Sequence, residues 1–562
     1  MKSFQSNRRR RNEEGSALAA VIVFGVLLGI GCVSLLSFSG ARIQASHQRW
    51  NSAEAFYHAE NVLNWGAQLI ADSSSSPVGT YSASNDKITM QYMPGLKGGG
   101  STAFQDAWLT IGNHPSGQAN LYRVTASAKV GNRVRTVQAN VQKNPASEVF
   151  DYEYFLNNWG WWWGSSITGN GGNRANGDFD FRGNPTVNGM VLANGTIESD
   201  GTRIDRLASA LPINGLAGAN PLNYLHDGAP RLEMPNLKNF AYYENLAKSK
   251  GGTLTVGTNI GISAVHTNGS KPGLYLNGTL ANPIQINGPV VIPGDVVISG
   301  YVTGIGTLYV GGNLYIAGDV NYVNGPDFSA PPETQAAGSR DAWVKNNLDA
   351  SKDLVAFAVR ESILGGQVNS PAWKSACIDP APYGLKHVGA EGNLGADGIP
   401  GTVDDGVKYW NTSGSGAPNS AWYDADGDGV EDVAYNYSAD VEMTSARAAR
   451  IAGYPATSET DASPKDYNDI SSNNFNTLNG IFYCNHAAAM RAAKANFVMN
   501  GSLICRDEAI IFSASARFNY DSRIHSRYSS DPNRFIDLGL PQAARCKVTA
   551  FAELAPVEGF YE

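Results

Sequence analysis

Apolar residues dominate the start of the chain. Residues 16–39 form an uncharged run that follows four consecutive arginines at 8–11. At 1.5 Å per residue, a helix over this run is about 36 Å long, enough to cross a hydrocarbon core of about 30 Å. Because positive charge stays on the cytoplasmic side, we expect the rest of the chain to lie outside the inner membrane. The pattern therefore predicts a single-pass membrane helix with a cytoplasmic N-terminus.

A helical pattern continues beyond the apolar run, which disfavours a short, cleaved secretory signal. Apolar and polar residues share three- and four-residue spacing at Ile43, Ser46, Trp50, Ala53, Tyr57, Glu60 and Leu63. Residues 16–70 are therefore predicted to form one helix about 80 Å long. Its first half is apolar all round, and its second half is amphipathic.

Alternation with a period of two predicts strands after the helix. Residues 121–142 form two such runs around Gly131-Asn132, the pattern of a hairpin with a tight turn. Earlier strands are expected at 87–92 and 107–111. A small antiparallel sheet packed on the long helix is therefore predicted.

Glycine recurs every six residues in the middle of the chain, at Gly288, Gly294, Gly300, Gly306, Gly312 and Gly318. Apolar residues lie two and four places after most of these glycines. The pairs are Val290/Ile292, Val296/Ile298, Leu308/Val310 and Leu314/Ile316, with Val302/Gly304 weaker and Ile284/Ile286 extending the phase upstream. Two inward residues and a small corner residue form a hexapeptide pattern, which predicts a parallel β-helix with three faces per coil.

The glycine-spaced stretch supplies only about two coils, whereas at least three are needed for a stable core. Residues 165–200 and 480–525 show similar alternation, so we expect them to join 252–325 in one solenoid. A long insertion at 331–479 would interrupt it. The start of this insertion, 333–364, is predicted to be helical, with apolar members Trp343, Leu348, Leu354, Phe357, Val359 and Ile363.

Residues 150–163 are dense in aromatic side chains. We interpret this segment as a buried cap that plugs the open end of the solenoid, since aromatic clusters are more often buried than displayed. The alternative is an exposed patch that binds a glycan or a partner.

One motif in the insertion carries metal chemistry. Carboxylates at alternate positions, with a glycine at the sixth position for the turn, can place several oxygen ligands around one Ca²⁺. The expected ligands are Asp424, Asp426, Asp428, the Val430 carbonyl and Asp432. Tyr435 stands where an EF-hand places its bidentate glutamate, so Asp440 or another residue would have to close the site. A structural calcium is predicted, and a solvated acidic turn is the alternative.

Composition narrows the function. The 562 residues carry a net charge of −8 and include 62 glycines, so a nucleic-acid partner is not expected. Outside the membrane run, Cys377, Cys484, Cys505 and Cys546 would face an oxidising compartment. Two disulfides could form there in any of three pairings, and buried free thiols are the alternative. The sequence contains no HExxH, CxxC, GxSxG or Walker motif, so we expect no enzymatic activity.

The basic leader, the Gly15 before the apolar segment, and residues 55–60 (AFYHAE) resemble PilX-type minor pilins and pseudopilins of type IV pilus and type II secretion systems. The resemblance implies cleavage by a prepilin peptidase between Gly15 and Ser16, and other pilin or pseudopilin subunits as partners. Typical pilins carry a glutamate five residues into the mature chain, where this chain has Ala20. This departure disfavours a major-pilin role.

These features predict a mainly β protein with a long N-terminal helix. We expect a leader at 1–15, the helix at 16–70, a pilin-like sheet at 71–146, a β-helix at 147–330, the insertion at 331–479, and closing strands with a tail at 480–562. The predicted function is a non-enzymatic minor pilin-like subunit, anchored in the bacterial inner membrane before it joins a filament.

The head would be periplasmic or extracellular and would serve at a filament tip, in initiation, or in adhesion, with a surface glycan as a further candidate partner. The alternative is a permanently anchored β-helical protein that binds or cleaves polysaccharide. N-terminal cleavage separates the two hypotheses.

Overall fold

The computed structural model describes residues 6–72, 77–82, 107–116, 120–143, 147–157, 160–183, 185–199, 202–203, 225–237, 239–332, 339–349, 351–378, 408–410, 421–423, 433–434, 438, 441–458, 461–492, 495–528, 536–542 and 546–554. The chain divides into two compact units. The first comprises Met1–Asn144 and Arg545–Glu562, and the second comprises Pro145–Ala544.

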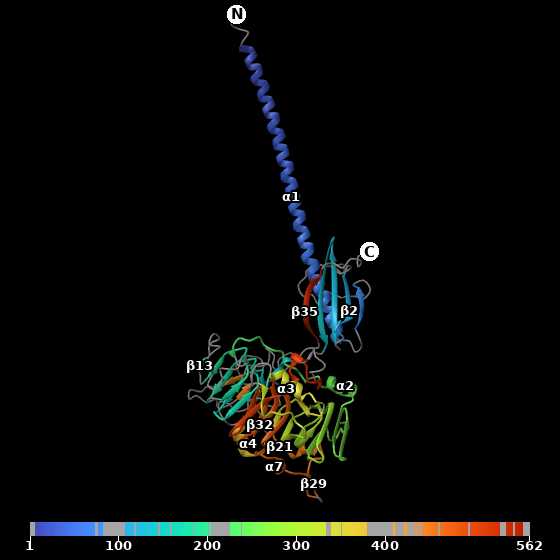
Figure 1. The fold of residues 1–562 in the computed structure, drawn as a ribbon, viewed down its shortest axis with the longest axis vertical. Helices are drawn as coiled ribbons and strands as arrows, with labels where there is room; N and C mark the ends of the chain where they lie inside the picture. The colour runs from blue at the N-terminus through green and yellow to red at the C-terminus, as the bar shows by residue number, and fades with distance from the viewer. Residues whose placement is uncertain are drawn as a thin grey trace. The chain divides into compact units, whose positions relative to one another are not determined.

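The first unit is a long helix on an antiparallel sheet (Figure 1). Helix α1 (Ser6–Asp72) confirms the predicted single helix. The sheet has the strand order β1-β2-β3-β4-β35. Its strands are β1 (Gly79–Ser82), β2 (Ala107–Asn113), β3 (Leu121–Val130), β4 (Arg133–Lys143) and β35 (Cys546–Leu554). The hairpin of β3 and β4 turns at Gly131 (φ +57°), as predicted, while the strand expected at 87–92 lies outside the described residues.

Small side chains let the last third of α1 approach the sheet closely. The buried helix residues are Ala55, Ala59, Val62, Leu63, Ala67 and Ile70. They pack on strand residues that include Leu109, Val124 and Val137. A Cβ placed on Gly66 would lie 2.8 Å from the Leu109 side chain, so a larger residue here would force that side chain to shift. Burial of these apolar surfaces holds the helix on the sheet.

The C-terminal strand corrects the expected domain boundaries. Residues 480–562 were predicted to close the solenoid and then end in a tail. Instead, β35 pairs antiparallel with β4 in the first unit, where Cys546 lies opposite Lys143 and Leu554 opposite Thr136. The sequence pattern does not reveal this partner, because pairing with a solenoid strand or with β4 would equally satisfy the backbone N–H and C=O groups of β35.

The second unit is built on a parallel β-solenoid, as predicted. Gly288 pairs with Gly306, so one coil takes 18 residues, or three hexapeptides. The inward apolar pairs predicted from the repeat are fully buried in a shared core, with Val290, Ile298 and Leu308 among its members. At Gly300 (φ +93°), an added Cβ would lie 1.9 Å from the Gly278 carbonyl oxygen. A side chain there would block the stacking of the coils.

Three stacks of parallel strands line the core. The first comprises β18 (Ile284–Ile292), β20 (Ile305–Val310), β22 (Leu354–Val359), β30 (Thr477–Cys484), β32 (Phe497–Cys505), β5 (Tyr154–Leu156), β8 (Asn173–Ala175), β11 (Val191–Ala193) and β14 (Leu225–His226). The second comprises β17 (Gly273–Gly278), β19 (Val296–Thr303), β21 (Leu314–Tyr322), β23 (Ile363–Gly365), β31 (Ala488–Arg491) and β33 (Ala509–Phe512).

The third stack uses the ends of the longer strands together with β34 (Ala516–Tyr520), β7 (Ile167–Asn170) and β10 (Thr186–Asn188). A separate small sheet holds β6 (Gly160–Trp163), β9 (Phe179–Arg182), β12 (Ile197–Ser199) and β13 (Thr202–Arg203). At the other end of the solenoid, the hairpin of β15 (Thr253–Val256) and β16 (Ile260–Ser263) pairs antiparallel with β18. Helix α2 (Phe240–Lys250) precedes this hairpin.

The coils do not stack in chain order. Strand β5 pairs with β32, and β7 pairs with β34, so the first solenoid segment continues from the last one. An asparagine ladder crosses this junction. It runs through Asn479, Asn500, Asn519, Asn170 and Asn188, whose successive side-chain amides hydrogen-bond at 2.7–2.9 Å. The ladder satisfies polar groups at the same corner of five successive coils, which joins the segments into one solenoid.

The helix predicted at 333–364 is wrong over its second half. Among the described residues of this range, only those of α3 (Ser339–Asn347) are helical, whereas 354–359 and 363–365 form solenoid strands β22 and β23. A short apolar run does not distinguish a buried strand from a buried helix, and here pairing of β22 with β20 and β30 decides. The predicted insertion is therefore two insertions, one on each side of these strands.

The second insertion holds short elements. They are α4 (Pro371–Cys377), β24 (Lys408–Trp410), β25 (Ala421–Tyr423), β26 (Val433–Ala434), α6 (Ser445–Ala449), β27 (Ile451–Ala452), β28 (Ala456–Ser458), β29 (Asp461–Pro464) and α7 (Tyr467–Ile470). The 3₁₀ turns η2 (Glu148–Asp151), η5 (Ser522–Ile524) and η6 (Ser526–Tyr528) complete the unit.

The aromatic segment 150–163 is largely buried, as predicted, but it is not an end cap. Phe155 is fully buried on β5, which pairs with strands on both sides, and Trp162 is 4% exposed on β6. Trp163 is exposed at 55%. Strand pairing therefore places these aromatic residues inside the stack of coils.

Candidate functional site

The N-terminal two-thirds of α1 is the most distinctive surface of the first unit. Every residue from Leu18 to Trp50 is exposed, and this stretch contains the uncharged apolar run. Among the described residues, one helix is long and apolar enough to cross a membrane, and none of its most apolar stretch is buried. In Figure 1, α1 extends far beyond the strands that cover its last turns. An apolar surface of this size requires lipid or other apolar helices around it.

An exposed apolar stripe continues along α1 beyond the lipid-length segment. Leu36, Ile43, Trp50 and Tyr57 recur every seven residues and are 60–73% exposed. The apolar residues of the predicted amphipathic pattern therefore lie on two faces of the helix. Leu63 is buried against the sheet, whereas the residues of this stripe are exposed. A seven-residue apolar spacing suits packing against another helix.

Glycines in α1 also favour close helix packing. Gly25 and Gly29 form a G-x-x-x-G pair, and a Cβ on either would meet nothing within 4 Å. This motif brings helices together in membranes because it removes side chains from one face. The sequence interpretation missed this signal, although the spacing is visible in the apolar run.

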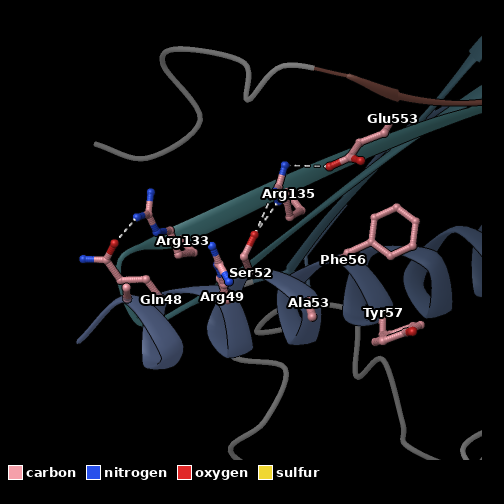
Figure 2. A pocket seen from close by; sticks show the side chains of 10 residues that line it. Gln48, Arg49, Ser52, Ala53, Phe56, Tyr57, Arg133, Arg135 and Glu553 are labelled. Carbon is pink, nitrogen blue, oxygen red and sulfur yellow. Dashed lines mark hydrogen bonds and ion pairs between the residues drawn. The ribbon is translucent and has the colours of Figure 1, made fainter. Parts of the chain in front are cut away.

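A basic groove lies where α1 leaves the sheet (Figure 2). Its volume is about 670 Å³, and its lining comes from α1, β4 and β35. Arg133 donates to Gln48 Oε1 at 2.6 Å. Arg135 donates to Ser52 Oγ at 2.6 and 2.9 Å and to Glu553 Oε1 at 2.8 Å. These guanidinium contacts tie the helix to the C-terminal strand.

The predicted cleavage residues Gly15 and Ser16 lie within α1, before the exposed apolar segment. This placement agrees with a leader that continues directly into the helix. Cleavage itself remains a prediction.

The four predicted disulfide cysteines, together with Cys32, are free thiols in the structure. Cys484 and Cys505 lie opposite each other on β30 and β32, and both are fully buried in the solenoid core. Burial raises the pKa of the Cys484 thiol well above its usual value. Cys377 is buried in the second unit, whereas Cys546 belongs to the first. The pairing remains a prediction.

The predicted calcium ligands Asp424, Asp426, Asp428, Val430 and Asp432 lie outside the described residues. The strands on either side are described, and Tyr423 on β25 pairs with Val433 on β26. The ends of the acidic segment are therefore held next to each other. Within the described parts of the chain, no group of three or more His, Cys, Asp or Glu residues is arranged to hold a metal.

Carboxylates that lie just after two late solenoid strands, β32 and β34, have structural partners. Asp507 lies 3.5 Å from His486 Nδ1, and Asp521 forms a bidentate pair with the fully buried Arg523 at 2.6 and 2.9 Å. Asp521 thereby neutralises the buried guanidinium of Arg523.

Comparisons with solved structures include a similarity to a pilin. The chain is similar to the competence-associated pilin ComZ from Thermus thermophilus, with 11% sequence identity and a TM-score of 0.25. The match covers 90% of this chain and 97% of that chain. A likeness at this score establishes neither a common fold nor a common function. No family model and no curated protein matches the chain.

Proposed function

We propose that the protein is a non-enzymatic, minor pilin-like subunit of a type IV pilus or type II secretion-like filament. The exposed apolar segment of α1 would hold it in the inner membrane before assembly. The same surface would later be buried against the helices of other subunits, because either environment removes it from water. The main support for this proposal is that Leu18–Trp50 is exposed throughout, while the following turns of α1 pack on a sheet of the same unit.

Two features of the first unit support assembly through α1. The stripe of Leu36, Ile43, Trp50 and Tyr57 continues the apolar surface beyond the membrane-length run. Gly25 and Gly29 offer a face on which a second helix can approach closely. A plain lipid anchor requires neither feature, whereas a helix that packs in a filament uses both.

The size of the second unit favours a rare subunit. The second unit spans Pro145–Ala544, whereas the first comprises only Met1–Asn144 and Arg545–Glu562. Heads of this size would crowd one another if every subunit along a shaft carried one. We therefore place the protein at a tip or in an initiation complex, where its solenoid would also serve adhesion.

Processing at Gly15 tests this proposal. In cells that contain a prepilin peptidase, the membrane-extracted protein is expected to begin at Ser16, and Gly15→Leu is expected to leave it intact, because a bulky side chain would occupy the cleavage position. Intact-mass spectrometry measures both N-termini.

Ala17→Leu, which keeps Gly15, is the matched control and should still be cleaved. An intact Met1 or a start other than Ser16 in the wild-type protein would instead support a permanent anchor, and so would cleavage that persists without the peptidase.

We also propose a structural Ca²⁺ in the segment between β25 and β26. The pairing of Tyr423 with Val433 supports this, since it brings together the ends of a segment rich in alternate carboxylates. Bound calcium would neutralise these carboxylates and order the segment.

Calcium removal is expected to lower the melting temperature of the detergent-solubilised full-length protein. Binding to the folded state stabilises it by mass action, about 2.7 kcal/mol at 100 times the dissociation constant. Scanning calorimetry with EDTA and with added CaCl₂ measures the shift. Asp424→Ala combined with Asp426→Ala should abolish the difference, whereas Asp397→Ala, in a separate acidic segment that lacks the alternate spacing, should preserve it. Identical melts of the wild-type protein under both conditions would refute the site.

A further inference from the structure

A second pocket lies on the flank of the solenoid, within the second unit. Its volume is about 310 Å³, at the lower end of the range for small-molecule sites. Its lining includes glycines from neighbouring coils, and Gly312 lies close to the Asp295 side chain. A Cβ on Gly312 would lie 2.3 Å from Asp295 Oδ1. The lining also includes Arg447, Arg450 and Ile451, which belong to the second insertion, far along the chain.

Hydrogen bonds preorganise the charged groups of this pocket. Asp295 Oδ1 accepts from the Asn313 backbone N–H at 2.8 Å, and Asp295 Oδ2 lies 3.7 Å from Arg447 Nε. Arg447 Nη1 also donates to the hydroxyl of the buried Tyr315. The Gly273 N–H donates to the Arg450 carbonyl at 3.1 Å, which fixes the insertion against β17. These contacts hold the insertion in place as one wall of the pocket.

The pocket mixes charges of both signs. The lining includes three arginines, Arg360, Arg447 and Arg450, and two carboxyl groups, Asp295 and Glu361. The side chains of Asp295 and Arg447 are only 17% and 21% exposed, so their charges are poorly screened by water. With both carboxyl groups ionised, the lining has a net charge of +1. It therefore attracts an anion while offering acceptors for hydroxyl groups.

We propose that this pocket binds an acidic saccharide, a sugar that carries a carboxylate, such as a uronate unit of a polysaccharide. Guanidinium groups of Arg447 and Arg450 would bind the sugar carboxylate, a geometry for which arginine is suited. The carboxyl groups of Asp295 and Glu361 would accept hydrogen bonds from its hydroxyls. This gives the adhesive role proposed above a ligand class and depends on that proposal only for its biological setting.

Other ligand classes fit this lining less well. A simple inorganic anion has no hydroxyl donors for the carboxyl groups, which would repel it. A neutral sugar leaves the excess positive charge uncompensated. A metal ion is disfavoured because three arginines share the lining with the two carboxyl groups, and none of the described residues forms a metal-binding group. A polyhydroxylated carboxylate uses both kinds of side chain.

The pocket also implies a dependence on pH. Burial, followed by the negative charge of Asp295, raises the pKa of Glu361 to about 7. The other charged or titratable groups acting on it are His486, Arg360 and Arg447. An anionic ligand favours the protonated, neutral Glu361, so affinity should be higher below pH 7 and fall as the pH rises through it. The affinity changes by at most about tenfold for each unit by which ligand binding raises the pKa of Glu361.

Isothermal titration calorimetry with digalacturonate tests the inference on the full-length protein in detergent. We expect saturable binding at pH 6 that weakens severalfold at pH 8. Arg450→Gln is expected to reduce affinity at least tenfold without changing the melting temperature, because its side chain is exposed. Glu361→Gln should remove the difference between the two pH values and bind at pH 8 nearly as tightly as the wild-type protein binds at pH 6.

Arg517→Gln, on β34 outside the pocket, removes the same charge and should bind normally. The inference is overturned if digalacturonate does not bind or if Arg450→Gln and Arg447→Gln bind like the wild-type protein. It is also overturned if uncharged galactobiose or inorganic sulfate binds equally well. These measurements are made in solution, so their failure would leave the N-terminal processing test unaffected.

Discussion

Two arginines in the apolar half of α1, introduced as Leu27→Arg with Ile30→Arg, are expected to release the protein from the membrane. Each charge at the centre of a membrane helix costs about 2.5–3.5 kcal/mol on insertion scales. The side chains of Leu27 and Ile30 are 61% and 59% exposed, so no part of the described protein can compensate for the new charges. Carbonate extraction followed by immunoblotting measures the fraction that stays in the membrane pellet.

The matched control is Leu27→Phe with Ile30→Leu, which keeps the segment apolar and should remain in the pellet. A doubly arginine-substituted protein that still resists carbonate extraction would show that α1 is not the anchor. The head would then have to bind the membrane by another surface.

Removing the carboxylate of Asp521 is expected to destabilise the solenoid strongly. Asp521 and Arg523 are almost fully buried, and Arg523 also donates to the Asp353 carbonyl at 2.8 Å. Asp521→Asn leaves a buried guanidinium without its anion, which costs about 3–5 kcal/mol of unfolding free energy. Calorimetry of the full-length protein should show a clear loss in melting temperature.

Two further variants distinguish the buried pair from a general charge effect. Replacing both members with leucine removes the uncompensated charge, so the double variant should be more stable than Asp521→Asn alone. Asp537→Asn breaks an exposed ion pair with Lys250 and should cost at most about 1 kcal/mol. Equal losses for the buried and the exposed variants would contradict this account.

Local patterns in the sequence predicted the elements that depend on local rules. The apolar run and the spacing after it predicted α1, because helix periodicity is a property of one segment. The six-residue glycine spacing predicted an 18-residue coil, which the pairing of Gly288 with Gly306 confirms. Alternation around Gly131 predicted the hairpin of β3 and β4.

Long-range pairing could not be predicted in the same way. Residues 354–359 form a strand only because β20 and β30 lie on either side, and their apolar run alone also fits a helix. The stacking of β5 on β32 places the first solenoid segment after the last one, and β35 joins the sheet of the first unit. Each of these choices depends on which distant backbone satisfies the strand.

The candidate sites follow the same division. Gly15 and Ser16 came from a contiguous motif, and the calcium segment came from regular carboxylate spacing. The saccharide pocket had no such signal, because Arg447 and Asp295 meet only after the second insertion folds back on the coils. The basic groove of the first unit similarly joins β4 to a strand from the opposite end of the chain.

The composition of sheared filaments tests the central claim, that α1 first anchors and then polymerises a large solenoid head. Filaments would be sheared from cells, pelleted and analysed by mass spectrometry for this chain and its N-terminus. We expect a small amount of the protein in this fraction, beginning at Ser16. Protein found solely in the inner membrane, with Met1 intact and none in the filaments, would contradict the account.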